Sequence, residues 1–405
     1  MHHLEIFRKR KSVLRFVWKV IDSVIKNMKK NILIFTDYYL PGFRSGGLIR
    51  SLVAVVEALK NHATITIVTR NHDCGVDIPY DDIAFDVMSE LNGCHILYLS
   101  NENILRGIFF LLKNEKFDLV YMNSFFSPLF TVYPLFLLRF FFNKKSKILL
   151  APRGELALGS LAIKKHRKKY FLIFRKFFQP TQNIFWHATS SEEKKDIEKK
   201  VGVHEKIIAL TDIALHSPSK TVFLSKEKNK LKIIFISRIT EIKNVDYALT
   251  VLMRVSGKVE FDIYGPIESS DYWVRCLSII ERLPENIIVN YRGELEYHQV
   301  METLRHYDLF LLPTKNENYC HAIVEALSTG CPVMISTQTP WHHLASFSAG
   351  WSFDLLYPEA FSEKINALIP LDEESYRQYH EGALRYFEQQ INNEHLVEEY
   401  KRYFL

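Results

Sequence analysis

Short apolar runs, each followed by a polar loop and a segment with apolar residues at steps of three and four, repeat along most of the chain. An apolar run between turn residues is typical of a buried strand, and the three-to-four spacing is typical of an amphipathic helix. The pattern predicts strands over 31–36, 63–70, 94–99, 119–123, 147–150, 184–187, 231–237, 259–264, 287–291, 309–312 and 332–335. Helices are expected over 48–60, 104–114, 129–142 and 394–404, among others. Strands that alternate with helices predict an α/β protein with parallel sheets.

The stretch from Pro313 to Ser336 combines a strand end, a polar loop, a helical segment and a second strand. In parallel sheets, ligands bind at the carboxyl ends of the strands, where the next helix offers unpaired N–H groups. Glu317 falls in that loop, and Glu325 falls about two turns into the helix, on a side that can face the same crevice. Two carboxylates there suit a ligand with phosphates and hydroxyls. The alternative is that Glu317 caps the helix and Glu325 is solvated.

Two further loops carry candidate phosphate contacts. Arg238 and Lys243 follow the strand 231–237, and two cations at a strand end are costly to place together unless an anion lies between them. Gly46 and Gly47 precede the helix 48–60, where the lack of a Cβ lets backbone N–H groups approach a phosphate. A plain turn is the alternative at this glycine pair.

Length and cysteine content limit the class of protein. The 405 residues, 47% of them hydrophobic, suit two domains of ordinary size. The five cysteines form no C-x-x-C pair, which argues against a disulfide framework and a zinc site and favours a reduced, cytoplasmic compartment.

Basic residues concentrate in two stretches. Residues 1–30 carry nine basic and two acidic residues, and 139–178 carry twelve and one, although the net charge of the chain is only +6. Within them, 13–28 and 160–178 have the spacing of amphipathic basic helices with aromatic residues. The stretch 13–28 is neither a signal peptide nor a membrane span, because Arg15, Lys19 and Asp22 interrupt its apolar residues. An anionic membrane surface is the expected partner. Nucleic acid is not expected, because the aromatic residues repeat at helical spacing. For 13–28 the alternatives are a helix packed on the domain and a disordered arm; for 160–178 the alternative is a solvated charged face.

The motif E-x7-E followed by A-L-S-x-G-x-P-V resembles the signature of retaining glycosyltransferases of family 4, which have the GT-B architecture. The form E-N-x-x-H-x-I-x-E-A-L, and P-R-G-E-L before a Lys-rich helix, resemble a bacterial polysaccharide-assembly subgroup. Two departures are visible. Tyr319 and Cys320 stand where relatives usually carry Phe-Gly, and Asn123 or Ser124 stands where many carry a His that contacts the sugar.

The resemblance implies two doubly wound, Rossmann-like domains that face each other across a cleft. We expect a basic amphipathic helix over 1–30, an acceptor-side domain over 31–215, a nucleotide-sugar domain over 216–390 and a helix over 391–405 that crosses back to the first domain.

The resemblance also implies roles for individual residues. Arg238 and Lys243 would clamp the donor diphosphate, Glu317 would bind the donor sugar, and Glu325 the ribose hydroxyls; the first three form the expected catalytic set. The other expected donor-binding residues are Gly46, Gly47, Gly265, Glu294, Leu295, Asn318, Tyr319, Cys320 and His321. The acceptor side is expected to comprise Asn123, Ser124, Arg153 and Glu155. No cofactor and no metal are implied, because the substrate is a nucleotide-diphosphate sugar and the chain has no D-x-D.

The expected activity is therefore metal-independent, retaining transfer of a hexose from a nucleotide-diphosphate sugar to a saccharide acceptor. A lipid-diphosphate-linked acceptor in bacterial surface polysaccharide biosynthesis fits a cytoplasmic protein that is peripheral on the inner face of the membrane. Two alternatives remain: a nucleotide-sugar epimerase of the same architecture, and a catalytically inactive GT-B scaffold, which the two departures favour.

Overall fold

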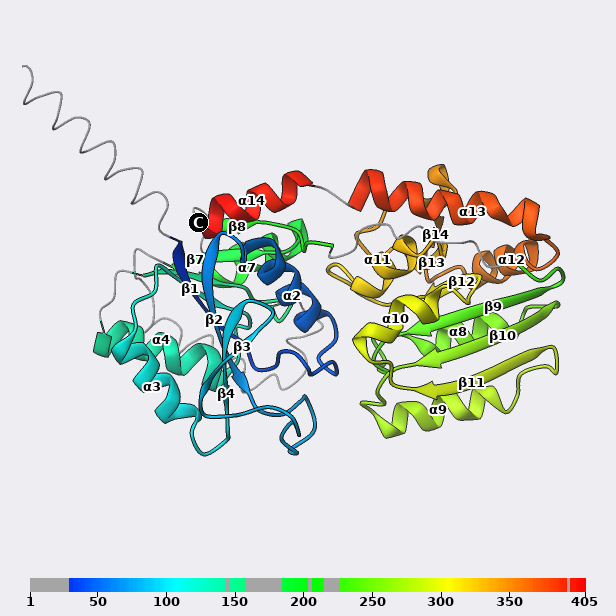
Figure 1. Cartoon of the computed structure of the whole chain (residues 1–405). Helices are drawn as coiled ribbons and strands as arrows, with labels where there is room; N and C mark the ends of the chain where they lie inside the picture. Colours follow the sequence, from blue (N-terminus) through cyan, green and yellow to red (C-terminus); the bar gives the residue numbers. More distant parts are fainter. Residues whose placement is uncertain (1–28, 143–145, 157–183, 203–205, 215–225, 392–393) are drawn as a thin grey trace, which may run out of the picture.

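The computed structural model describes residues 29–142, 146–156, 184–202, 206–214, 226–391 and 394–405. These residues form two α/β units, each built on its own sheet (Figure 1). The predicted basic helices over 13–28 and 160–178 lie outside the described residues.

The first unit contains an eight-stranded sheet in the order β3-β4-β2-β1-β5-β6-β7-β8. All neighbouring strands are parallel except β3, which is antiparallel to β4 and was not predicted. The strands are β1 (Lys30–Phe35), β2 (Ala63–Arg70), β3 (Met88–Leu91), β4 (Cys94–Leu99), β5 (Leu119–Met122), β6 (Lys147–Leu150), β7 (Ile184–Ala188) and β8 (Ile207–Ala209).

Helices cover both faces of this sheet, and each face has its own cluster of buried apolar side chains. The helix α2 (Gly47–Leu59) packs on one face, and α3 (Ile104–Asn114), α4 (Tyr133–Leu137) and α7 (Ser191–Val201) pack on the other. Helices on both faces exclude water from the parallel strands, as their nearly continuous apolar runs require.

The second unit contains six parallel strands in the order β11-β10-β9-β12-β13-β14. The strands are β9 (Lys230–Ile236), β10 (Lys258–Tyr264), β11 (Ile287–Gly293), β12 (Leu309–Leu312), β13 (Val333–Ser336) and β14 (Gly350–Phe353). The helices are α8 (Val245–Leu252), α9 (Ser270–Ile280), α10 (Tyr297–Leu304), α11 (His321–Ser328), α12 (Pro358–Leu368) and α13 (Glu373–Tyr386). One continuous apolar cluster spans this unit.

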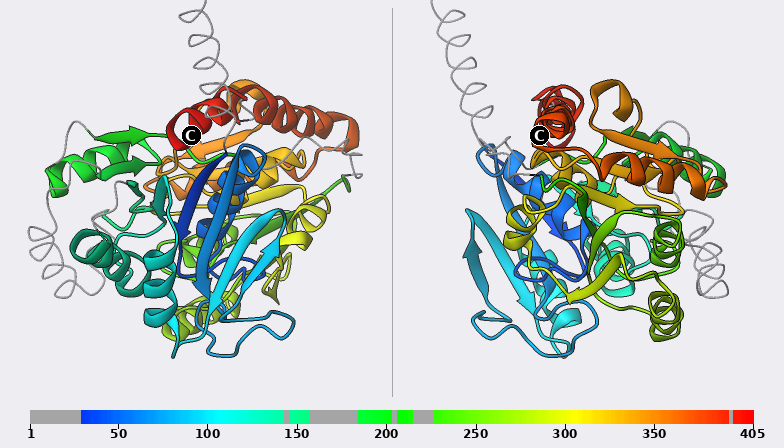
Figure 2. Two further views of the ribbon diagram at one scale, coloured as in Figure 1. Left: turned by 60° about the vertical axis from the view of Figure 1, so that its left-hand side comes forward. Right: turned by 90° about the vertical axis from the view of Figure 1, so that its right-hand side faces the viewer.

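The last helix, α14 (Glu394–Phe404), lies on the first unit (Figure 2). Tyr400 and Phe404 are buried in the same cluster as α2, and the Nζ of Lys147 donates to the carbonyl of Tyr403 at 2.7 Å. The chain therefore ends on the unit in which its first strand lies.

The segment predicted as one core helix over 129–142 is helical throughout in the structure, but only its middle is a regular α-helix. A π-helical turn over Pro128–Val132 precedes α4, and a second over Leu138–Phe142 follows it. Pro134, near the start of α4, has no N–H group to donate to the preceding turn, which is consistent with the change in hydrogen-bonding pattern there. In the part of the chain that the structure describes, no helix is long and apolar enough to cross a membrane.

Candidate active site

A cavity of about 510 Å³ lies between the two units. Its walls are the loops that follow β1, β5 and β6 in the first sheet and β9, β10, β11 and β12 in the second. Because parallel strands place all their carboxyl ends at one edge, the two sheets present their ligand-binding edges to each other across this cavity.

Almost every residue expected at the site from the sequence lines the cavity. From the first unit these are Gly46, Gly47, Asn123, Ser124, Arg153 and Glu155. From the second they are Arg238, Lys243, Gly265, Glu294, Leu295, Glu317, Asn318, Tyr319, Cys320 and His321. The exception is Glu325, which is 2% exposed and does not reach the cavity surface.

The two expected phosphate cations are each balanced by a carboxylate. Lys243 forms an ion pair with Glu317, and both side chains are largely buried. The Nη1 of Arg238 lies 2.8 Å from Glu268 Oε1, and both of these side chains are about half exposed. The cations therefore do not repel each other at the strand end, and Arg238 is the more accessible of the two.

The start of α11 has an unusual backbone. Cys320, its N-terminal cap, has φ 67° and ψ 85°, a left-handed conformation that glycine adopts without strain and that costs other residues about 1–2 kcal/mol. This is the position at which the resembling family usually has glycine. Burial raises the pKa of the Cys320 thiol to about 12, so the thiol stays neutral near pH 7. No side chain caps this helix, which removes the alternative that Glu317 is a cap.

Glu325 lies on the second turn of α11 and forms an ion pair with Arg50 of α2, in the first unit. We expected this carboxylate to face the same crevice as Glu317, but Arg50 covers it. Its expected role toward a ribose stays a prediction.

The loop before α2 carries the glycine pair. Gly46 caps α2 with φ 57° and ψ −120°, which only glycine adopts readily. Nearby, Arg44 Nη2 lies 3.0 Å from Glu294 Oε1 of the second unit, whereas Glu294 Oε2 is buried with no hydrogen-bond partner. A buried acceptor without a partner at a cavity wall is suited to receive a donor from a bound molecule.

On the acceptor side, Arg153 is fixed by three hydrogen bonds. Its Nε donates to Asn123 Oδ1 at 2.7 Å, its Nη1 to Asp212 Oδ1 at 2.5 Å, and its Nη2 to the Tyr121 hydroxyl at 2.7 Å. The bond to Arg153 sets the orientation of the Asn123 amide, and the Nδ2 of this amide is buried without a hydrogen-bond partner. Asn123 therefore presents a free N–H donor at the strand end where the resembling family often has a histidine.

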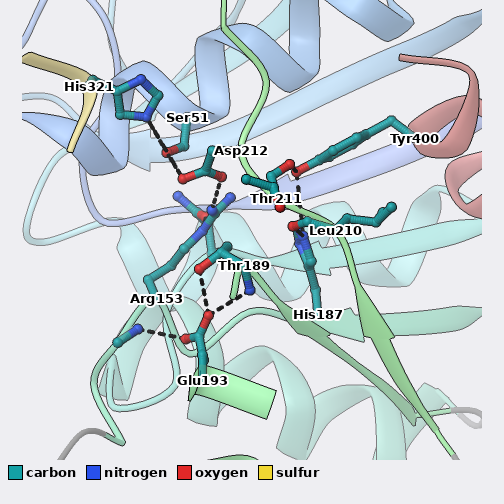
Figure 3. Close-up of polar contacts among 12 residues, drawn as sticks. Ser51, Arg153, His187, Thr189, Glu193, Leu210, Thr211, Asp212, His321 and Tyr400 are labelled. Carbon is teal, nitrogen blue, oxygen red and sulfur yellow. Dashed lines mark hydrogen bonds and ion pairs between the residues drawn. The ribbon is translucent and has the colours of Figure 1, made fainter. Parts of the chain in front are cut away.

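The loop that carries Arg153 is held from below by a buried glutamate (Figure 3). Glu193 accepts hydrogen bonds from the backbone N–H of Gly154 at 2.6 Å and from both the N–H and the hydroxyl of Thr189, at 2.7 and 2.6 Å. Glu155, in the same loop, accepts hydrogen bonds from the Ser124 hydroxyl and from the N–H groups of Phe125 and Phe126.

Sequence reasoning missed Asp212, Ser51 and Arg50, which also line the site or bridge it. The Ser51 hydroxyl donates to Asp212 Oδ2 at 2.7 Å and lies 2.8 Å from Nε2 of His321 (Figure 3). Burial by itself raises the pKa of Asp212, but Arg153 and the bonds from His321 and Ser51 hold it well below its usual range. These residues stand outside any motif, and only the polar pair Arg50-Ser51 in an otherwise apolar stretch of helix could have drawn attention.

The Ser51, His321 and Asp212 side chains do not form a hydrolase triad. In a triad the carboxylate orients the histidine through one ring nitrogen while the other contacts the hydroxyl. Here Asp212 receives the hydroxyl hydrogen of Ser51 itself and lies 3.8 Å from the same Nε2 atom of His321. The arrangement instead links the two units.

The helix α14 contacts the backbone just before Asp212. The Tyr400 hydroxyl of α14 donates to the carbonyl of Thr211 at 3.1 Å, and His187 lies 2.9 Å from the carbonyl of Leu210 (Figure 3). Burial lowers the pKa of His187 to about 4, so its ring is neutral near pH 7. These bonds fix the backbone that presents Asp212.

The geometry defines a two-unit fold with a polar cleft between facing carboxyl edges, and comparison with solved structures assigns the fold. HepE of Anabaena, in complex with UDP and glucose, aligns over 92% of this chain and 99% of its own, with a TM-score of 0.65 and 14% identity. The predicted GT-B fold is confirmed.

Comparison of the sequence with known proteins is more specific. Residues 219–385 match the family model "Glycosyl transferases group 1". An uncharacterized 41.2 kDa protein in the cps region of Klebsiella pneumoniae is 23% identical over 230 residues, 55% of this chain and 61% of that protein. The O-antigen biosynthesis glycosyltransferase WbnH of Escherichia coli is 24% identical over 228 residues, 54% and 59% of the two chains. The chain spans about three fifths of the length of these relatives. Residues 219–385 thus match a glycosyltransferase group 1 domain model, and the chain has the GT-B fold.

Proposed function

We propose that the protein is a retaining glycosyltransferase of family 4 that transfers a hexose from a nucleotide-diphosphate sugar to a saccharide acceptor. The observation that carries the proposal is that one cavity brings Arg238, Lys243 and Glu317 of the second unit opposite Asn123 and Arg153 of the first. Donor-side cations thus face fixed hydrogen-bonding groups across a space large enough for two sugars.

On the donor side, Arg238 and Lys243 bind the diphosphate, together with the backbone amides at the start of α11. Breaking the bond between sugar and phosphate places negative charge on the departing diphosphate. Cations and N–H groups already fixed at that position lower the barrier, because they need not reorganise during the reaction. Glu317, released from Lys243 as the lysine turns to phosphate, accepts hydrogen bonds from the donor sugar hydroxyls.

On the acceptor side, the unpaired N–H of Asn123 donates to a sugar oxygen, a bond that a histidine N–H would otherwise supply. The acceptor hydroxyl attacks the anomeric carbon from the face that the diphosphate leaves. The bond from that carbon to the diphosphate breaks, the departing diphosphate takes up the hydroxyl proton, and the anomeric configuration is retained. The similarity to WbnH, an O-antigen biosynthesis glycosyltransferase, and to HepE in complex with UDP and glucose supports a nucleotide-sugar donor and a role in surface polysaccharide biosynthesis. We propose a lipid-diphosphate-linked acceptor and a peripheral position on the inner face of the membrane, through the basic stretches.

A panel of nucleotide-diphosphate sugars tests the proposal, first by thermal shift. A ligand at 100 times its Kd should stabilise the fold by about 2.7 kcal/mol. The stabilising donor is then incubated with lipid-linked saccharide acceptors, and NMR identifies the product anomer.

Each outcome of this assay has a distinct meaning. Transfer with the donor configuration kept supports the proposal, and an inverted product refutes retention. An isomerised nucleotide-sugar without transfer indicates an epimerase. Donor binding without any turnover indicates a scaffold.

A further inference from the structure

Arg50 of the first unit reaches into the second unit. Its guanidinium forms an ion pair with the carboxylate of Glu325 on α11, and its Cζ lies 5.7 Å from the ring centroid of Tyr297, the first residue of α10. The Arg50 side chain is 16% exposed and that of Glu325 only 2%. The cation therefore lies between an acidic and an aromatic side chain of the opposite unit, a position that favours a planar guanidinium.

Arg50 also separates Glu325 from the cavity. Arg50 lines the cavity, as do Leu295 and Ala322 of the second unit, but Glu325 does not. A hydroxyl in the cavity can contact Arg50 at the wall, whereas the Glu325 carboxylate lies beneath the surface.

A second bond lies beside this ion pair. Ser51 follows Arg50 on α2, and His321 precedes Glu325 by one turn on α11, so the Ser51–His321 contact of 2.8 Å runs next to Arg50–Glu325. Ser51 in addition donates to Asp212, which holds Arg153 on the acceptor side. The helix α2 thus connects the donor-side helix α11 to the acceptor-side wall.

We propose that Arg50 gates the donor site: it holds the Glu325 carboxylate in the contact between the two units, and the ribose hydroxyls of a nucleoside diphosphate displace it. The inference rests on the proposed function, in which the Glu325 carboxylate binds the ribose hydroxyls of the donor. Donor binding then replaces one bond between the units by a bond to the ligand, while the Ser51–His321 contact remains as a pivot. The affinity for nucleotide is reduced by the fraction of molecules in which Arg50 holds Glu325.

The test is a titration of the full chain with UDP, ADP and GDP by calorimetry. If Arg50 competes with the ribose, Arg50→Ala should bind the preferred nucleotide roughly tenfold more tightly, as expected where nine molecules in ten have the contact closed. Glu325→Ala should bind it more weakly. Arg50→Gln keeps an amide donor without the charge and should tighten binding less; it replaces the alanine variant if that variant does not fold.

The matched control is Lys60→Ala. Lys60 lies at the end of the same helix and pairs with Glu57 at 2.7 Å within the first unit, so its loss removes an ion pair that does not join the units. Its nucleotide affinity should equal that of the wild type.

A second arm uses the 2′,3′-dideoxy nucleoside diphosphates. These nucleotides lack the hydroxyls that compete for Glu325. The Arg50→Ala variant should therefore bind them no more tightly than the wild type does. A general loosening of the structure would change the affinity for both forms of the nucleotide.

The outcomes separate the gate from the proposed function. If the wild type binds a nucleoside diphosphate but Arg50→Ala binds it equally or more weakly, Arg50 does not compete with the ribose and the gate is refuted alone. A gain that persists with the dideoxy nucleotide also refutes it. If the wild type binds no nucleotide and no nucleotide-sugar, both the proposed donor site and the proposed role of Arg50 are refuted.

Discussion

The guanidinium of Arg153 lies 2.5 Å from the carboxylate of Asp212, and the two side chains are only 4% and 8% exposed. Removing one partner of a buried ion pair leaves the other charge buried without compensation, which typically costs about 3–5 kcal/mol. Asp212→Asn should therefore lower the free energy of unfolding at pH 7 by about that amount. Denaturant unfolding measures it, with Glu57→Gln on the surface of α2 as a control that should change stability by less than about 1 kcal/mol.

The same pair predicts a pH dependence. The pKa of Asp212 is depressed in the folded protein, so its stabilising effect is fully present above the ordinary carboxyl pKa of about 4. It is lost as the pH falls from there through the folded-state pKa, because the unfolded chain then binds a proton that the folded chain does not. The stability difference between wild type and Asp212→Asn should therefore be constant from pH 7 to about 5 and should narrow below about pH 4. A difference that stays unchanged down to the acid unfolding transition contradicts this account.

Arg238 and Lys243 predict a loss of turnover. If they stabilise the departing diphosphate, Arg238→Ala or Lys243→Ala should reduce kcat by roughly 10²-fold or more. Arg275→Ala is the matched control for Arg238→Ala. Like Arg238, Arg275 is about half exposed and is paired with a glutamate, Glu241, but it does not line the cavity. Normal kinetics in a folded Arg238→Ala protein would remove Arg238 from the clamp.

Glu317 and Glu325 predict different losses with different ligands. Glu325→Ala should weaken the binding of the bare nucleotide and of the nucleotide-sugar alike, since both ligands contain the ribose. Glu317→Ala should weaken the binding of the nucleotide-sugar only, because only this ligand contains the sugar hydroxyls that Glu317 is expected to bind. Equal losses for the bare nucleotide in both variants would show that the two roles are assigned wrongly. Calorimetric Kd values for the two ligands provide the comparison.

Gly265, at the end of β10, predicts a steric penalty at the cavity wall. Its φ is 136°, and a Cβ there would lie 1.9 Å from the carbonyl oxygen of Ser237, a backbone atom that cannot turn away. Gly202 has φ 70° but open space around it, so a Cβ there adds only the left-handed strain of about 1–2 kcal/mol. Gly265→Ala should therefore destabilise the protein clearly more than Gly202→Ala in thermal unfolding. If the two variants lose the same stability, the backbone at Ser237 moves to make room for the added Cβ.

The basic stretches outside the described residues predict binding to anionic membranes. Each Lys or Arg near an anionic leaflet contributes about 1 kcal/mol, and the effect fades beyond a Debye length of about 8 Å. Deletion of residues 1–30 should weaken flotation with anionic vesicles and leave transfer to a soluble acceptor analogue intact. Salt should release the full-length chain. Equal recovery with neutral and anionic vesicles at low salt would exclude an electrostatic attachment.

The sequence by itself determined the architecture and most of the cavity. The run Ala63–Arg70, rich in β-branched residues, and the apolar run Leu309–Leu312 form strands with the predicted bounds, because strands covered on both faces favour such residues. The carboxyl ends of parallel strands lie at one edge, so residues that follow them, such as Arg238 and Asn123, reach the cavity without further information. The short edge strand Met88–Leu91 was missed, because its alternating, half-exposed residues give little hydrophobic signal.

Only the tertiary structure decided which charges meet. Arg50 and Glu325 are 275 positions apart, and Arg153 and Asp212 are 59 apart, so no local spacing joins either pair. Each pair forms because two helices or loops are fixed at a short distance by the packing of the apolar side chains beneath them. The burial of Glu325 under Arg50 also depends on how the two units face each other, which a pattern within one helix does not specify. The sequence thus determines which residues stand at the strand ends, and the packing of the two units determines which of their charges pair.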